Sequence, residues 1–394
     1  MTNKKDDKTV KMFPTLKDDI REDGKHQPEA HTPHTQRAAH GTGTREDSNH
    51  QPDTHAQKPS RSDWQRLYKA ADAFRELAPW KWMDDDRIFG VKCPETGEIY
   101  YCCVLGALKE VFALVAYEGA EGLDGYLKLS SGEIESGPLA SEYQRVLMAS
   151  FENRSYLESR DLAVIRDLGR KYRGRNAWPL FRHYLPGYFP WFLSAVQTRT
   201  LAACLEQAVE ILPRCARNPS LLANPDAGRY LVRVRETSAD GKAEWRDTIL
   251  APTPLHRAAP NIPVNEIAIA RLCRNPKKLS GDWEIGYCYT PMRIQEHPDQ
   301  RPFQPRLLGI VDAQSGFILS MGVEADDQHL PVFRDMLLDC LEQAGQWPRS
   351  ILVNHENSAA LAAPIAKALG ISLMRVRNLP GFAMVYEHML ESMC

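Results

Sequence analysis

The sequence predicts an α/β protein, with an α+β N-terminal domain followed by a C-terminal mixed sheet flanked by helices. Two observations support this fold class. Residues 281–394 read as short apolar strands and helices in the order β-β-β-α-β-α-β-α, and residues 61–150 read as an amphipathic helix followed by three apolar strands. With 394 residues and 43% hydrophobic content, the chain can bury one large core or two ordinary ones.

Composition excludes several classes of function. The net charge of -2 and the pI near 6.6 argue against general attraction to a polyanion, so any contact with nucleic acid requires a local basic patch. The start, "MTNKKDDKTVKMF", lacks the apolar stretch of a signal peptide, and no segment approaches the roughly 20 apolar residues of a membrane span. The nine cysteines form no CxxC pair. We therefore expect a cytoplasmic protein with reduced thiols and no membrane partner.

Residues 1–60 are rich in Asp, Lys, His, Gln, Pro and Thr and contain few large apolar residues, which predicts a disordered tail. The tail carries an internal duplication, because "REDGKHQPEAH" from Arg21 recurs as "REDSNHQPDTH" from Arg45. Six of the twelve histidines lie in it. These histidines either bind a transition metal or belong to a solvated segment copied by duplication.

Residues 61–150 predict a small α/β domain. In "SDWQRLYKAADAFREL", Ser62 or Asp63 can cap a helix whose apolar residues recur at helical spacing. "RIFGVKC-PETG-EIYYCCVLG" predicts two strands around a Pro/Gly turn, "EVFALVAYEG" a third strand, and "AEGLDGYLKL" a short helix.

Residues 151–260 predict a helical region rich in aromatic and basic residues, with a hairpin around Asp240-Gly241 and a Pro-rich linker. Its most unusual segment is "KYRGRNAWPLFRHYLPGYFPWFL", Lys171 to Leu193. Aromatic rings stack on bases and arginines bind phosphates, which suits single-stranded nucleic acid. The prolines instead favour an extended segment that anchors its rings in a core or a domain interface. The candidate binding residues are Arg173, Arg175, Trp178, Arg182, Tyr188 and Trp191.

The C-terminal region, residues 261–394, has the clearest pattern. Three strands are predicted in "DWEIGYCYTPMRI", "RLLGIVDAQ" and "GFILSMGVE", followed by the helix "HLPVFRDMLLDCLEQAG" and the strand "SILVN". The helix "SAALAAPIAKALG" ends at Gly370, and the strand "ISLMRVRN" and the helix "GFAMVYEHMLESM" close the chain. This order implies an antiparallel hairpin set extended by parallel strands through right-handed crossovers.

The segments "WEIGY", "GIVDAQSGFIL", "ILVNHENS" and "LPGFAMVYEHM" occur in that order. The order of the segments resembles the ribonuclease-H-like fold. The residues within them resemble the catalytic core of retroviral-type integrases and transposases. The whole chain also resembles a bacterial two-domain family, built from domains of unknown function, that joins an N-terminal α/β unit to such a domain.

The resemblance implies that the three catalytic carboxylates of the integrase core would fall at Gly286, Asn354 and Glu387. Two hard cations require at least two aspartates to hold and neutralise them. Glycine offers no ligand, and asparagine offers one neutral carbonyl. The sequence therefore predicts a degenerate site without a cofactor and a non-enzymatic module that binds another protein or nucleic acid.

Two alternatives stay open. If "RLLGIVDAQ" were the first strand, Asp312, Glu356 and Glu387 could bind Mg²⁺ or Mn²⁺ in a nuclease or transposase relative. Alternatively, His355, Glu356 and His388, with Glu387, could hold a borderline metal. The chain has no GxxxxGK[ST], GxGxxG, GxSxG or HExxH motif, so we expect no nucleotide cofactor.

Overall fold

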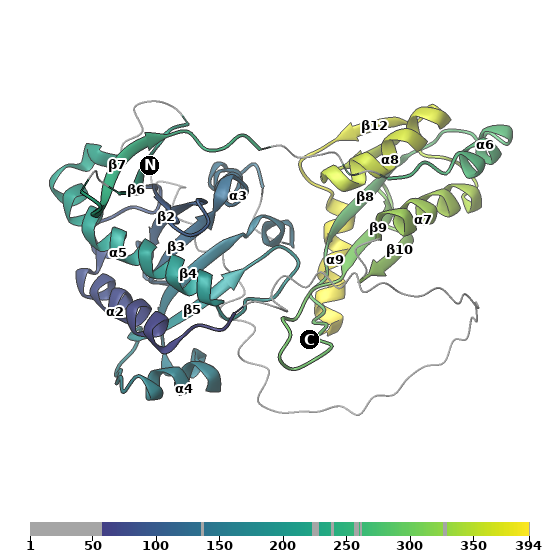
Figure 1. Cartoon of the computed structure of the whole chain (residues 1–394). Coiled ribbons are helices and arrows are strands. Elements are labelled where there is room, and N and C mark those ends of the chain that lie inside the picture. Colours follow the sequence, from purple (N-terminus) through teal and green to yellow (C-terminus); the bar gives the residue numbers. More distant parts are fainter. Residues whose placement is uncertain are drawn as a thin grey trace, which may run out of the picture.

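The structure, a computed structural model, contains two mixed sheets flanked by helices, which form two lobes (Figure 1). An α/β architecture is therefore confirmed. The tail is predicted over residues 1–60, of which residues 1–56, with all six of its histidines, lie outside the described residues. None of the described helices is long and apolar enough to cross a membrane. The described residues are 57–134, 138–222, 228–237, 240–255, 260, 262–325 and 329–393.

The N-terminal sheet has seven strands in the order β5-β4-β3-β2-β1-β6-β7. Neighbouring strands are antiparallel except β1 and β6, which are parallel. The sheet takes strands from both sides of residue 150, so the two N-terminal regions expected from the sequence share one sheet. The strands are β1 (Phe89–Lys92), β2 (Ile99–Leu105), β3 (Ala113–Glu118), β4 (Val146–Glu152), β5 (Trp178–Tyr184), β6 (Tyr230–Thr237) and β7 (Ala243–Leu250).

Helices cover both faces of this sheet. The adjacent helices α2 and α5 pack on one face, and α3 packs on β2 and β3 at the other. Ser60, rather than Ser62 or Asp63, is the N-cap of α2, because its hydroxyl and the Asp63 carboxylate form a reciprocal capping box. The helices are α2 (Arg61–Leu77), α3 (Gly119–Ser131), α4 (Ser159–Asp167) and α5 (Ala195–Arg217), with short 3₁₀ helices η2 (Pro79–Lys81), η3 (Pro138–Tyr143), η4 (Arg154–Tyr156) and η5 (Pro219–Leu222).

The C-terminal sheet has the strand order β10-β9-β8-β11-β12. β8, β9 and β10 are antiparallel, whereas β8, β11 and β12 are parallel, as the sequence predicts. One further helix, α6, follows an Asn265 cap in the C-terminal region, where the sequence predicts no helix before the first strand. The elements are α6 (Glu266–Arg274), β8 (Asp282–Tyr289), β9 (Arg306–Asp312), β10 (Ile318–Glu324), α7 (His329–Gln343), β11 (Ser350–Val353), α8 (Glu356–Leu369), β12 (Ser372–Arg375) and α9 (Pro380–Met393).

β8 separates two cores in the C-terminal lobe. Alternate residues of a strand point to opposite faces. Trp283, Ile285 and Tyr287 belong to the core covered by α7 and α8. Cys288 belongs to the smaller core formed with α9. Gly286 lies on the α9 face, because its nearest neighbour is the Phe382 ring of α9.

The loop between β8 and β9 joins the lobes. The backbone N–H of Phe189 donates to the Pro302 carbonyl at 3.0 Å, and that of Gln304 donates to the Gly187 carbonyl at 2.8 Å. The buried Arg301 guanidinium donates from Nε to the Phe189 carbonyl at 2.9 Å and contacts Nδ1 of His183 at 3.2 Å. The aromatic and proline-rich segment around residue 188 therefore forms part of the contact between the lobes.

Candidate functional site

The candidate site lies at the carboxyl edge of β11, where ligands commonly bind in open α/β sheets. His355 is the N-cap of α8, and its Nδ1 accepts from the backbone N–H of Asn357 at 3.0 Å. Because Nδ1 accepts, Nε2 carries the imidazole proton. The ring stacks on Tyr287, with centroids 4.7 Å apart. The sequence thus places the loop correctly, at the end of the fourth strand and the start of the next helix.

The N-terminal lobe covers this edge. Glu142 comes from η3, and its Oε2 lies 2.7 Å from Nε2 of His355, with both side chains less than a tenth exposed. The hydroxyl of Tyr287 is 2.8 Å from Nε2 of the buried His329. Burial raises the pKa of Tyr287 and so keeps its phenol neutral. These side chains form two buried pairs, His355 with Glu142 and Tyr287 with His329, which are linked by the stacked rings of Tyr287 and His355.

Two oxygens beside these pairs accept no hydrogen bond from the described part of the chain. They are Oδ1 of Asn354 and Oε1 of Glu142, and both are buried. A buried carbonyl or carboxylate oxygen normally has a donor, from protein or from water. The edge of β11 therefore offers two acceptor positions to a water molecule or to a ligand that carries N–H or O–H groups.

An aromatic ring fills the space beside Gly286, the position at which the resemblance would place the first aspartate. A Cβ atom added at Gly286 would lie 2.1–2.3 Å from three ring carbons of Phe382. The same ring lies over Gly309 of β9, within 2.8–2.9 Å of an added Cβ. Two residues before Gly286, the buried Glu284 carboxylate accepts from the Phe382 N–H at 2.8 Å, and burial raises the pKa of Glu284. This surface of β8 thus holds α9 in place and has no room for a carboxylate at residue 286.

The structure does not bring the alternative catalytic residues together. Asp312 pairs with Trp283 on β8, whereas Asn354 follows Val353, whose β8 neighbour is Ile285. The Asp312 carboxylate instead accepts from the N–H and hydroxyl of Ser315 at 2.8 and 2.7 Å, and these bonds lower its pKa. Asp312 therefore caps the turn between β9 and β10, away from the carboxyl edge of β11.

The candidate metal ligands are also dispersed. Glu356 is exposed in the first turn of α8, and Glu387 and His388 are exposed on α9. Nδ1 of His388 lies 2.8 Å from the Met384 carbonyl, one helical turn earlier. Within the described ranges, no three or more His, Cys, Asp or Glu side chains form a group that could hold a metal ion.

The candidate binding residues divide into buried and exposed groups. Arg182 is buried in β5, where its guanidinium pairs with Asp161 at 2.8 and 2.9 Å. Tyr188 and Trp191 form backbone bridges, to Phe303 and to His183 respectively. Trp178 is half-buried in β5, whereas Arg173 and Arg175 are exposed.

Sequence reasoning missed Glu142, Phe382 and Arg301, which shape the site and the contact between the lobes. Only Phe382 had a usable signal. A glycine inside an apolar strand, such as Gly286 in "WEIGYCY", often marks the close approach of another group. Glu142 and Arg301 contact residues that are far away in the sequence. Such contacts leave no periodic pattern in the sequence.

Comparison with known families divides the chain at the same place as the sheets. Residues 64–233 match a domain of unknown function, DUF7309, and residues 268–390 match a second, DUF6930. The chain is similar to two domains of unknown function. The DUF7309 match ends within β6, and the DUF6930 match spans β8 to β12 and most of α9. No curated protein matched the chain. The two matches support the expected two-domain family and assign no activity to it.

Proposed function

We propose that the DUF6930 region is a ribonuclease-H-like domain that has lost its metal site, and that the protein is a non-catalytic binding protein. The order β10-β9-β8-β11-β12, with three antiparallel strands followed by two parallel ones, supports this fold assignment. So does the occurrence of the four integrase-like segments in the expected order.

The Phe382 ring over Gly286 carries the proposal. Two-metal catalysis needs an anionic oxygen at this position, and the ring occupies the space in which the side chain would stand. Asn354 supplies at most one neutral carbonyl at the second position, and Glu387 is an exposed residue of α9. One carboxylate cannot neutralise two divalent cations.

A nuclease assay tests the proposal directly. The full chain is incubated with labelled single- and double-stranded DNA and RNA, with Mg²⁺ or Mn²⁺, beside an active nuclease as positive control. We expect no cleavage above the level of the buffer. Cleavage by the wild type that disappears in Glu387→Gln would overturn the proposal, because it would assign a catalytic carboxylate to the site.

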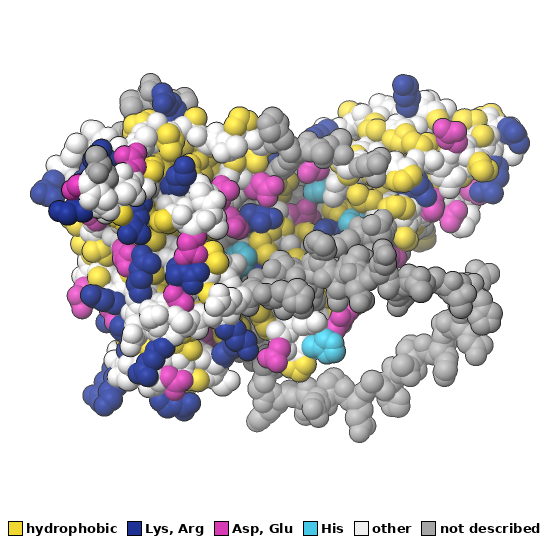
Figure 2. All heavy atoms as spheres, in the orientation of Figure 1, with side chains coloured by type: hydrophobic (Ala, Val, Ile, Leu, Met, Phe, Trp, Pro, Cys, Tyr) yellow, Lys and Arg dark blue, Asp and Glu magenta, His cyan; other side chains and the backbone are white. Residues whose placement is uncertain are grey.

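A second candidate function is the binding of single-stranded nucleic acid on the DUF7309 surface around α4. Figure 2 shows Lys and Arg side chains gathered at this end of the N-terminal lobe. Lys171, Arg173 and Arg175 are exposed there. The Arg154 guanidinium lies 5.9 Å from the Trp178 ring centroid. Exposed cations beside an aromatic ring suit a phosphate backbone with stacked bases.

Binding of a fluorescein-labelled oligo-dT checks this candidate. Replacing Arg173 and Arg175 together by alanine should reduce the slope of log K against log salt by about 1.4, since each phosphate contact on a single strand contributes about 0.7. Trp178→Ala should weaken binding by about 1–3 kcal/mol. Arg246→Ala removes an exposed arginine from β7 and serves as the matched control. Equal effects of Arg246→Ala and the double variant would contradict a specific surface.

A further inference from the structure

β10 is an edge strand whose outer side faces no other strand of the described chain. Its backbone N–H and C=O groups on that side are therefore available to another strand. Pairing with β9 is regular from Ser320 to Glu324, after a register shift at Ile318. The opposite edge, β12, has four residues and ends at Arg375, whereas β10 has seven and contains no Lys, Arg or Pro. β10 thus lacks the Lys and Pro residues that commonly block an exposed edge.

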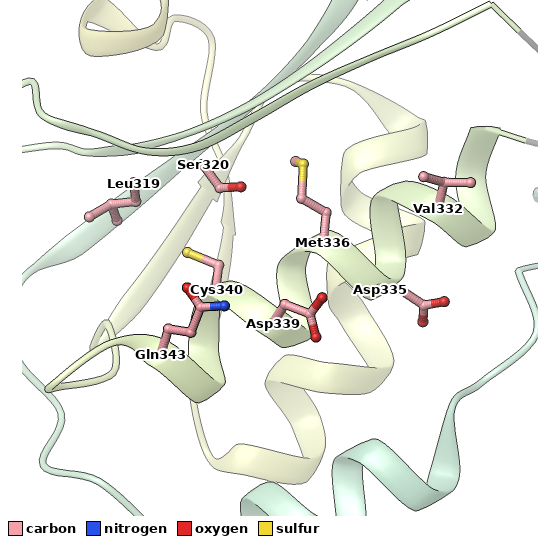
Figure 3. Close-up of a pocket in the computed structure, with 8 residues that line it drawn as sticks. All are labelled: Leu319, Ser320, Val332, Asp335, Met336, Asp339, Cys340 and Gln343. Carbon is pink, nitrogen blue, oxygen red and sulfur yellow. The ribbon is translucent and has the colours of Figure 1, made fainter. Parts of the chain in front are cut away.

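A groove lies between β10 and α7. Its volume is about 490 Å³, and its apolar lining comes from Leu319, Val332, Met336 and Cys340. Figure 3 shows Leu319 and Ser320 on the strand, with the Met336 and Cys340 side chains pointing toward it from the helix. An edge strand beside a helix, with an apolar groove between them, is suited to an extended peptide that adds to the sheet.

The other face of β10 is also apolar and exposed. Ile318, Met321 and Val323 are 41%, 46% and 40% exposed, and Phe317, just before the strand, is 69% exposed. Met321 and Val323 pair with Gly309 and Leu307, which lie on the α9 face of the sheet. A strand added beside β10 would therefore meet apolar side chains on both faces.

The charged residues beside the groove indicate which kind of ligand it binds. Among the residues that line the groove, the charged ones are Asp335 and Asp339, and Glu324 ends the strand. Arg334 pairs with Asp335 at 2.7 Å, so the exposed Asp339 carries most of the negative field of the groove. A second copy added through the same edge would bring like charges together, and nucleic acid would be repelled. A cationic chain is favoured.

We propose that β10 and the groove between β10 and α7 bind an extended peptide that alternates apolar and basic residues, as a sixth strand of the C-terminal sheet. Apolar side chains of the peptide pack beside Met321 and Val323 on one face of the sheet, and the basic side chains, which alternate to the other face, lie over the groove beside Asp339. This proposal goes beyond the loss of the metal site. It does not depend on that loss, because β10 is the outermost strand of the sheet and contains none of the residues of that site.

The test is a fluorescence anisotropy titration of the full chain with a labelled octapeptide of alternating lysine and valine. Met321→Glu should weaken binding at least about tenfold, because it places a charge against the apolar side chains of the added strand. Met374→Glu is the matched control: Met374 is 48% exposed, on the opposite edge strand, and its replacement should leave the affinity unchanged. Asp339→Lys should weaken binding as well. Thermal unfolding followed by circular dichroism verifies that the variants fold.

Two further peptides decide the mode of binding. A peptide with glutamate in place of lysine should not bind. A peptide N-methylated at alternate backbone amides should lose binding, since it cannot complete a ladder with β10. Equal affinity for the N-methylated peptide, or equal effects of Met321→Glu and Met374→Glu, would overturn the proposal. So would a wild-type dimer in sedimentation velocity that Met321→Glu dissociates, because a second copy would then occupy the edge.

Discussion

Replacing Gly286 by aspartate is expected to destabilise the C-terminal domain by about 3 kcal/mol or more. The added Cβ would lie 2.1–2.3 Å from ring carbons of Phe382, and the ring is itself buried against β8 and β9. The new carboxylate would also be buried among apolar side chains. The free energy of unfolding, measured by urea denaturation, checks the expectation. Gly345→Asp is the control, because a Cβ added at Gly345 meets no atom within 4 Å.

The same clash predicts a rescue. Phe382→Ala alone should cost about 3–5 kcal/mol through the cavity it leaves. The double variant Gly286→Asp/Phe382→Ala should be more stable than the sum of the two single effects, because the aspartate then occupies part of that cavity. Additive effects in the double variant would show that the Phe382 ring does not exclude a side chain from this position. A Gly286→Asp variant as stable as the wild type would show the same.

The C-terminal strands and their order could be predicted because each one combines a short apolar run with a turn or a helix signal. "SILVN" followed by "HENSAAL" placed Asn354 and His355 at the edge of β11, and the pairing of β11 with β8 and β12 bears this out. The chemistry at that edge could not be predicted. His355 pairs with Glu142, which lies more than 200 residues earlier in the sequence, and such a pair leaves no local pattern.

In the N-terminal lobe the hairpin of β1 and β2 was predicted correctly, because a Pro/Gly turn separates two apolar runs. The strand β5 was harder, since "WPLFRHY" contains a proline and lies in a region that reads as helical. The sheet order explains why a strand forms there. β5 is the edge strand of its sheet, and a proline is tolerated where its missing N–H faces no neighbouring strand.

Replacing Arg301 by methionine is expected to lower the free energy of unfolding by about 3 kcal/mol. The arginine side chain is 2% exposed and donates to the carbonyls of His183 and Phe189, across the contact between the lobes. Methionine keeps the aliphatic stem but leaves these two buried carbonyls without their donor. Urea denaturation measures the loss, and limited proteolysis of the Pro-rich linker should become faster as the lobes separate more often.

Arg293→Met is the matched control for this prediction. Arg293 lies on the same loop between β8 and β9, but it is exposed, and its guanidinium is 5.5 Å from the Phe189 ring centroid. A surface cation over a ring contributes about 0.5–1 kcal/mol, so this variant should change stability by no more than that. Equal losses in the two variants would mean that burial of Arg301 adds nothing. A large loss of unfolding free energy in Arg301→Met alone would show that the loop between β8 and β9 stabilises the contact between the DUF7309 and DUF6930 regions.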